Sequence, residues 1–88
     1  MNIDELWTNV LNHCGDVFYT KTGLPFTYKR VDSLRVKVNR DGRYVGYIKR
    51  QDMKFILENP YARTSEYVKV MRVSAYATAL YREFVENN

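Results

Sequence analysis

Apolar residues near the N-terminus recur at helical spacing. They stand at positions 3, 6, 7, 10 and 11, and these steps of three and four place them on one face of a helix. Asp4 and Glu5 lie in the expected first turn, where negative charge favours the helix dipole. Gly15 provides a stop signal. The pattern therefore predicts a helix over residues 3–14.

The chain then changes to β-type patterns. Residues 17–20 and 25–29 are rich in aromatic and β-branched side chains, which are typical of strands. The segment between them, residues 21–24, contains Gly23 and can form a turn. We expect these two runs to form a hairpin.

A strict alternation follows over residues 34–39. Leu34, Val36 and Val38 alternate with Arg35, Lys37 and Asn39, so one face of the strand is apolar and the other is basic. The run 39–42 ends in Asp-Gly, and glycine accepts the positive φ that tight turns require. Residues 43–49 are therefore predicted to return as the next antiparallel strand.

The rest of the chain is predicted to be mostly helical. A short helix is expected over residues 52–59, because Pro60 prevents its continuation. From residue 64 onward an apolar stripe recurs at steps of three and four, at Val70, Val73, Ala77, Leu80 and Phe84. Ser74 can cap a new helix within this segment. Residues 66–72 fit either a separate short helix or a strand, because Tyr67, Lys69 and Met71 also alternate with their neighbours.

Together these elements predict an α+β fold. The expected architecture is an N-terminal helix, an antiparallel sheet of three or four strands, and C-terminal helices packed on one sheet face. Residues 1–88 are expected to form a single domain, since so short a chain cannot fill two cores. No run of apolar residues is long enough to predict a membrane span. The apolar C-terminal stripe can pack on its own sheet or on a second copy, so a homodimer remains open.

Charge is concentrated in one part of the chain. Residues 21–54 hold ten of the fourteen basic side chains against three acids, a local charge of +7, whereas the first twenty residues contain three acids and no base. Aromatic residues are interleaved with these bases. Lys and Arg neutralise phosphates and flat rings offer stacking surfaces, so this block favours contact with a polyanion.

The predicted strands determine which bases share a face. Arg35 and Lys37 project from one side of their strand, but which residues of the next strand join them depends on register. One register adds Arg43, Tyr47 and Lys49, and the other adds Tyr44 and Arg50 and gives a smaller patch. Basic residues of the neighbouring turns can extend either surface: Lys29, Arg30 and Arg40. The candidate nucleic-acid-binding residues are Arg35, Lys37, Arg43, Tyr47, Lys49 and Arg50.

Catalytic and metal-binding patterns are weak by comparison. His13 and Cys14 are the only imidazole and thiol, and neighbours on a helix point about 100° apart, which argues against a dyad. Two such ligands are too few for structural zinc. A nuclease using Asp41 and Asp52 is disfavoured, because a turn and a helix start do not bring carboxylates together on rigid elements. We predict no enzyme, metal site or cofactor.

One stretch resembles a known type of domain. The run Phe18-Tyr19-Thr20-Lys21-Thr22-Gly23-Leu24-Pro25-Phe26-Thr27-Tyr28 is followed by Arg43, Ile48-Lys49-Arg50, Asp52 and Ser74-Ala75-Tyr76. Taken together, residues 7–80 resemble a small domain that occurs in bacterial and phage proteins of unassigned function. The resemblance implies a compact α+β domain of prokaryotic type and carries no activity with it.

The combined pattern predicts a non-enzymatic module whose basic sheet face binds nucleic acid. DNA is favoured over RNA, and the contacts are expected to be mainly with the phosphate backbone. The alternative is a small interaction or inhibitory module, of phage type, that binds an acidic protein. Steep salt dependence distinguishes the first from the second, because phosphate contacts release counterions. The single cysteine, Cys14, fits a reducing cytoplasm. No membrane association is predicted.

Overall fold

The computed structural model describes residues 1–60, 66–68 and 71–87. In chain order the elements are α1 (Ile3–Asn12), β1 (Phe18–Tyr19), β2 (Pro25–Asp32), β3 (Arg35–Arg40), β4 (Arg43–Lys49), α2 (Arg50–Glu58), α4 (Ser74–Tyr81) and the π-helical segment η1 (Arg82–Glu86). The predicted α+β class is confirmed. Among the described parts of the chain, no helix has both the length and the apolar character needed to cross a bilayer.

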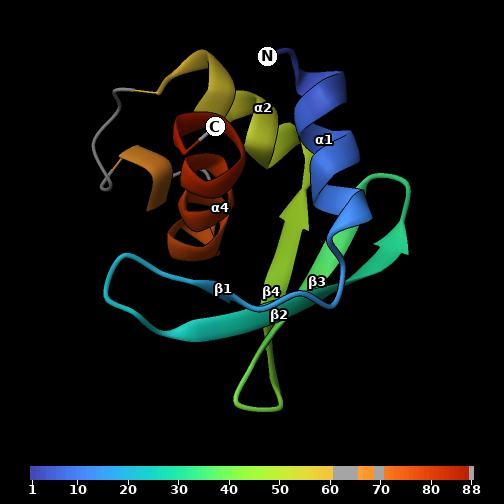
Figure 1. Cartoon of the computed structure of the whole chain (residues 1–88), viewed down its shortest axis with the longest axis vertical. Coiled ribbons are helices and arrows are strands. Elements are labelled where there is room, and N and C mark those ends of the chain that lie inside the picture. The colour runs from blue at the N-terminus through green and yellow to red at the C-terminus, as the bar shows by residue number, and fades with distance from the viewer. Residues whose placement is uncertain (61–65, 69–70, 88) are drawn as a thin grey trace.

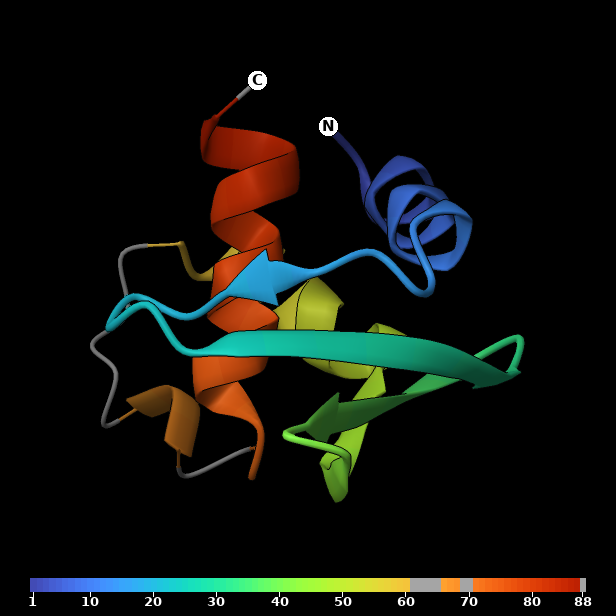
Figure 2. The same ribbon diagram turned by 60° about the horizontal axis from the view of Figure 1, so that its bottom comes forward.

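The four strands form one antiparallel sheet in the order β1-β2-β3-β4. Each strand therefore pairs with its neighbour in sequence, and short turns make every connection (Figure 1). Figure 2 shows α1, α2 and α4 together on one side of this sheet. The other side carries no helix or strand from the described residues.

Alternation along the strands produces this two-sided arrangement. Val36, Val38 and Ile48 are fully buried against the helices, and their strand neighbours project to the opposite side because side chains alternate across a pleated strand. Tyr28 is also fully buried, and its hydroxyl donates a 2.7 Å hydrogen bond to the carbonyl of Val10 in α1. Burial raises the pKa of the Tyr28 hydroxyl. The apolar half of the predicted alternation therefore forms the sheet side of the core.

The first helix packs onto this core through the face that the spacing predicts. Leu6 and Val10 are fully buried, and the Trp7 indole N–H donates to the carbonyl of Ser33 at 2.8 Å, between β2 and β3. The side chain of Asn2 caps the helix by accepting from the backbone N–H of Glu5. The helix ends at Asn12 rather than at residue 14, as helix termini commonly vary by one or two residues.

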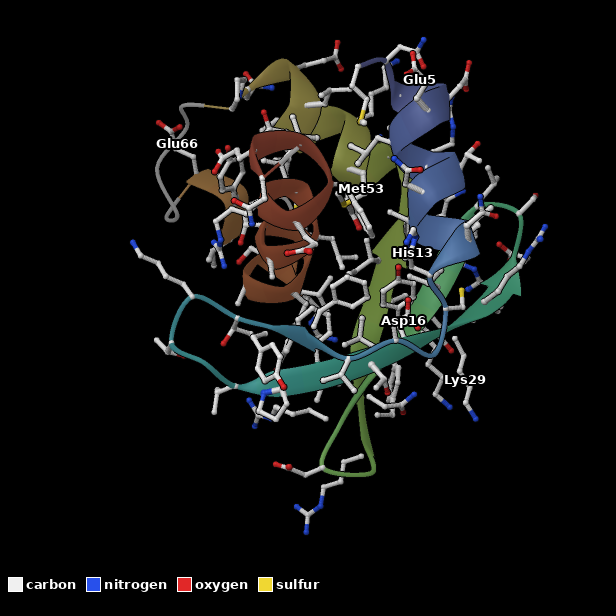
Figure 3. All side chains as sticks on the ribbon, in the orientation of Figure 1. Glu5, His13, Asp16, Lys29, Met53 and Glu66 are labelled. Atoms are coloured by element: carbon white, nitrogen blue, oxygen red, sulfur yellow. The ribbon has the colours of Figure 1, made fainter. Side chains whose placement is uncertain are left out.

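The second helix begins at Arg50, two residues before the predicted start. The Asp52 carboxylate accepts a 3.0 Å hydrogen bond from the backbone N–H of Lys49, which satisfies a donor at the helix entrance. Partial burial raises the pKa of Asp52, and the hydrogen bond and charge of Lys49 act in the opposite direction. Met53 lies fully buried between the helices and the sheet (Figure 3).

A helix start at Ser74 was one of the alternatives, and α4 begins there. The predicted cap is wrong, because Val73 is the N-cap residue and no side-chain hydrogen bond caps the helix. Residues 66–68 are helical, which decides that part of the 66–72 segment in favour of helix. Val70, a member of the predicted stripe, lies outside the described residues. The remaining stripe residues Val73, Ala77, Leu80 and Phe84 are buried.

Candidate nucleic-acid interface

Cross-strand pairing assembles a basic surface on the open side of the sheet. Lys29, Lys37 and Tyr47 form one row across β2, β3 and β4, because Lys29 pairs with Lys37 and Lys37 pairs with Tyr47. A second row begins at Asp32 and continues through Arg35 to Lys49. Lys29 points away from the helices in Figure 3. We use the name basic face for the set Lys29, Arg35, Lys37, Tyr44, Tyr47 and Lys49.

A β-bulge adds Tyr44 to this face. Val38 pairs with Gly46 but Asn39 pairs with Tyr44, so Val45 has no partner on β3. An extra residue in one strand reverses the alternation beyond it. Tyr44 and Tyr47 therefore share a face although they are three residues apart, and their ring centroids lie 5.3 Å from each other.

The same bulge contradicts the prediction for Arg43. This residue pairs with Arg40, whose guanidinium donates to the hydroxyl of Tyr76 in α4 at 3.1 Å. Cross-strand partners share a face, so Arg43 lies on the helix side at the tip of the β3–β4 hairpin. The observed pairing matches neither predicted register in full. Tyr47 and Lys49 share the face of Arg35 and Lys37, as the first register predicts, but Tyr44 takes the place predicted for Arg43.

Basic side chains contact the two rings directly. The guanidinium carbon of Arg35 lies 5.1 Å from the ring centroid of Tyr47, and the Lys37 ammonium lies 5.2 Å from that of Tyr44. Both distances fall within the range of cation–π attraction. The contacts hold positive charge next to aromatic surface, which is the combination expected at a site for phosphates and bases.

One acid moderates the charge at the end of the face. Asp32 accepts from the Arg35 guanidinium at 3.0 Å. The pKa of Asp32 is lowered, first by a hydrogen bond from the backbone N–H of Leu34 and also by Arg35. Both side chains remain substantially exposed, so the ion pair is screened by water and leaves Arg35 able to contact a ligand.

Arg50 occupies a different position from the one predicted. It is the first residue of α2, and its guanidinium lies 2.6 Å from the Asp4 carboxylate in α1. Arg50 therefore links two helices rather than joining the rows of the sheet. It also borders a surface cavity of about 550 Å³ beside the basic face, lined by Asp32, Leu34, Arg35, Lys49, Arg50, Gln51 and Lys54.

The remaining candidate groups do not converge. Asp41 lies in the turn before β4 and Asp52 in the first turn of α2, so the length of β4 separates them, about 20 Å for a strand of this size. His13 Nδ1 contacts the carbonyl of Asn9, and the Cys14 thiol donates weakly to the carbonyl of Val10. Within the residues that the structure describes, no three His, Cys, Asp or Glu side chains gather as a metal site.

Sequence reasoning missed Tyr44 as a companion of Tyr47. Glycine inside a strand often marks a bulge, and Gly46 lies beside the unpaired Val45, so a signal was present. Lys29 lies within β2, as the predicted strand over residues 25–29 implies, and it stands in the central row rather than in a neighbouring turn. Arg40 does not extend the face, because it turns toward Tyr76.

Comparison with known proteins identified no relative: no protein-family model, no curated protein and no solved structure matches this chain. The prediction of a bacterial or phage domain type stays a prediction.

Proposed function

We propose that this protein is a non-enzymatic module that binds nucleic acid, with DNA as the first ligand to test, through the basic face of its sheet. The observation that carries the proposal is the pairing of the strands. It places Lys29, Arg35, Lys37 and Lys49 together with two tyrosine rings on the side of the sheet where no described helix packs. Positive charge alone fits many partners. Charge interleaved with aromatic rings on one face of a sheet fits nucleic acid best.

The spacing of the bases supports contact with a phosphate backbone. Neighbouring strands lie about 4.8 Å apart, and residues two apart on a strand are separated by about 6.8 Å. Lys37 and Lys29 are cross-strand partners, and Arg35 and Lys49 form the next pair along. These four cations can therefore follow successive phosphates over a short length of strand. Backbone contacts of this kind orient a ligand without reading its sequence.

Salt dependence provides the primary test. Four phosphate contacts predict a slope of log affinity against log salt between about −2.8 and −3.6, which corresponds to a loss of about 50- to 150-fold between about 50 and 200 mM salt. The measurement is fluorescence anisotropy with labelled single-stranded and duplex DNA and with RNA of the same sequence. A protein that binds none of these ligands at the lowest salt contradicts the proposal.

Variants then locate the contacts. Replacing Arg35 and Lys37 with alanine should flatten the salt slope by about 1.4 to 1.8, because two contacts are lost. The matched control replaces Lys21 and Arg82, which border a cavity shared with Tyr76 of α4 on the helix side, and it removes the same total charge. An equal change in both double variants assigns the effect to net charge rather than to the basic face.

A second candidate, an acidic protein partner, is favoured by one specific observation. Leu34 and Val31, at the β2–β3 turn, are 59% and 44% exposed, and Leu34 borders the cavity that also contains Lys49 and Lys54. Exposed apolar side chains surrounded by basic residues suit a protein interface. A shallow salt slope, together with loss of partner binding when Leu34 is changed to Ser, supports this candidate.

Both candidates fit a cytoplasmic site of action. The only cysteine, Cys14, is a free thiol that hydrogen-bonds within α1, and free thiols persist in reducing compartments. We therefore extend the proposal to the cytoplasm. Thiol labelling of the protein in intact and permeabilised cells tests this placement.

A further inference from the structure

Two tyrosines on the basic face point to the type of strand that it binds. Tyr44 is 53% exposed and Tyr47 is half-buried, and both lie on the side of the sheet away from the core. They are not needed to fill the interior, which is formed on the opposite side by residues such as Val38 and Ile48. Large rings grouped on an otherwise charged surface are typical of a binding site.

The geometry of the pair suits successive bases. The ring centroids are 5.3 Å apart and the ring planes meet at 57°, so the two rings do not stack on each other. Lys37 lies over the ring of Tyr44 and Arg35 lies over the ring of Tyr47, so a base stacks on the opposite ring face or displaces the cation toward a phosphate. A strand with bases on Tyr44 and Tyr47 therefore brings its phosphates close to Lys37 and Arg35.

A hollow next to the rings provides space for a base. A cavity of about 620 Å³ runs along β4 and is lined by Tyr44, Val45, Gly46, Tyr47, Lys49, Asp52, Met71 and Arg72. Asp52 contributes a carboxylate that disfavours phosphate there but can accept a hydrogen bond from a base amino group. Arg72 and Lys49 add two positive charges to the lining. The hollow thus offers space for a base beside the rings, with one hydrogen-bond acceptor and two cations in its lining.

We propose that the ligand of the basic face is a single strand, whose consecutive bases stack on Tyr44 and Tyr47 while its phosphates contact Lys37, Arg35 and neighbouring cations. This inference rests on the proposed function and specifies its substrate class. Duplex bases are stacked inside the helix and expose only their edges, so they cannot reach the two rings. Each base stacked on an aromatic side chain strengthens binding about five- to 150-fold.

The experiment compares three fluorescein-labelled ligands by anisotropy at one low salt concentration. They are a thymine-rich single strand, an abasic strand of the same length and charge, and a duplex of the same length. The wild-type protein should bind the single strand at least about tenfold more tightly than the abasic strand. The single strand should also bind more tightly than the duplex, although the duplex has the higher charge density.

Variants assign the preference to the rings. Changing Tyr44 and Tyr47 to Leu should abolish the preference for bases but preserve the weak binding of the abasic strand, whereas changing both to Phe should retain the preference because the ring remains. Tyr19→Leu is the matched control, since Tyr19 is 62% exposed on β1, outside the basic face. Circular dichroism confirms that each variant is folded.

The outcomes separate the two proposals. If none of the three ligands binds, both the nucleic-acid function and this inference are wrong. If the abasic strand or the duplex binds as tightly as the single strand, the nucleic-acid function stands and the stacking inference is overturned. Equal loss of affinity for all ligands in the Leu and Phe variants also overturns the inference.

Discussion

Gly46 allows β4 to approach the start of α4, and its replacement by alanine provides a sharp test of this packing. A Cβ atom at this position lies 2.5 Å from the Cγ1 atom of Val73, whereas carbon atoms in ordinary contact are about 3.5–4.0 Å apart. The backbone φ of Gly46 is +152°, a conformation that residues with side chains rarely adopt. Gly46→Ala therefore introduces both a steric clash and backbone strain.

The expected loss of stability follows from these two effects. Overpacking in a filled core costs about 1–3 kcal/mol, and a strained backbone costs about 1–3 kcal/mol. A domain of this size has a total free energy of unfolding of roughly 4–13 kcal/mol. We therefore expect Gly46→Ala to lower the free energy of unfolding by about 4 kcal/mol, a large fraction of the total.

Two further variants separate the clash from the strain. Gly42→Ala introduces a residue at φ +75° with no atom within 4 Å of the new Cβ, so it should cost only about 1–2 kcal/mol. Val73→Ala removes the Cγ1 atom that Gly46→Ala meets. In that background the cost of Gly46→Ala should fall by about 1–3 kcal/mol, because only the strain remains.

Urea denaturation measures these differences, with Trp7 as the probe. Trp7 is the only tryptophan, it is 4% exposed, and its indole bonds to Ser33 between β2 and β3, so its fluorescence reports on the packing of α1 against the sheet. Additive effects of Gly46→Ala and Val73→Ala, within about 0.5 kcal/mol, refute the steric explanation. A Gly46→Ala protein as stable as Gly42→Ala does the same.

Three other changes test separate contacts. Tyr28→Phe should lower the free energy of unfolding by about 1 kcal/mol, because the buried hydroxyl loses its hydrogen bond to Val10; an unchanged urea midpoint contradicts this. Arg50→Gln should change stability by less than about 1 kcal/mol, since its partner Asp4 is 83% exposed and water screens the pair, and thermal denaturation at low and high salt measures the effect. The pKa of Asp52 is raised in the folded protein above its ordinary value of 3.8. The contribution of Asp52 to stability therefore falls as the pH rises from 3.8 through the pKa of the folded state. Asp52→Asn should therefore gain stability relative to the wild type over this interval, and a difference that is constant in urea titrations across pH refutes the assignment.

The secondary structure followed from local patterns where these were regular. The strand predicted over residues 43–49 has the same bounds as β4, and the break at Ser74 is the start of α4. Helix boundaries were less accurate, because they depend on caps such as the Asp52 bond to Lys49. Strand β2 continues to Asp32, beyond its predicted end, since pairing with β3 extends it.

The candidate interface was only partly predictable. The sequence left two registers open, and one of them groups Arg35 and Lys37 with Tyr47 and Lys49. The strand pairing places these four residues on one face. The placement of Arg43 on this face was wrong. The bulge at Val45 lies between Tyr47 and Arg43 and reverses the alternation of side chains, so Arg43 lies on the opposite face. The alternation of residues along the sequence cannot show such a reversal. A bulge depends on which residues of two strands are paired, and the spacing within one strand does not contain that information.

The α+β class, the strand alternation and the concentration of positive charge follow from the amino-acid order, because each depends on the identity and spacing of neighbouring residues. The tertiary structure alone decided that Tyr44 joins Tyr47 and that Arg50 turns to Asp4. It also placed Gly46 against Val73. These contacts depend on how paired strands and packed helices meet in space, and local spacing does not specify that arrangement.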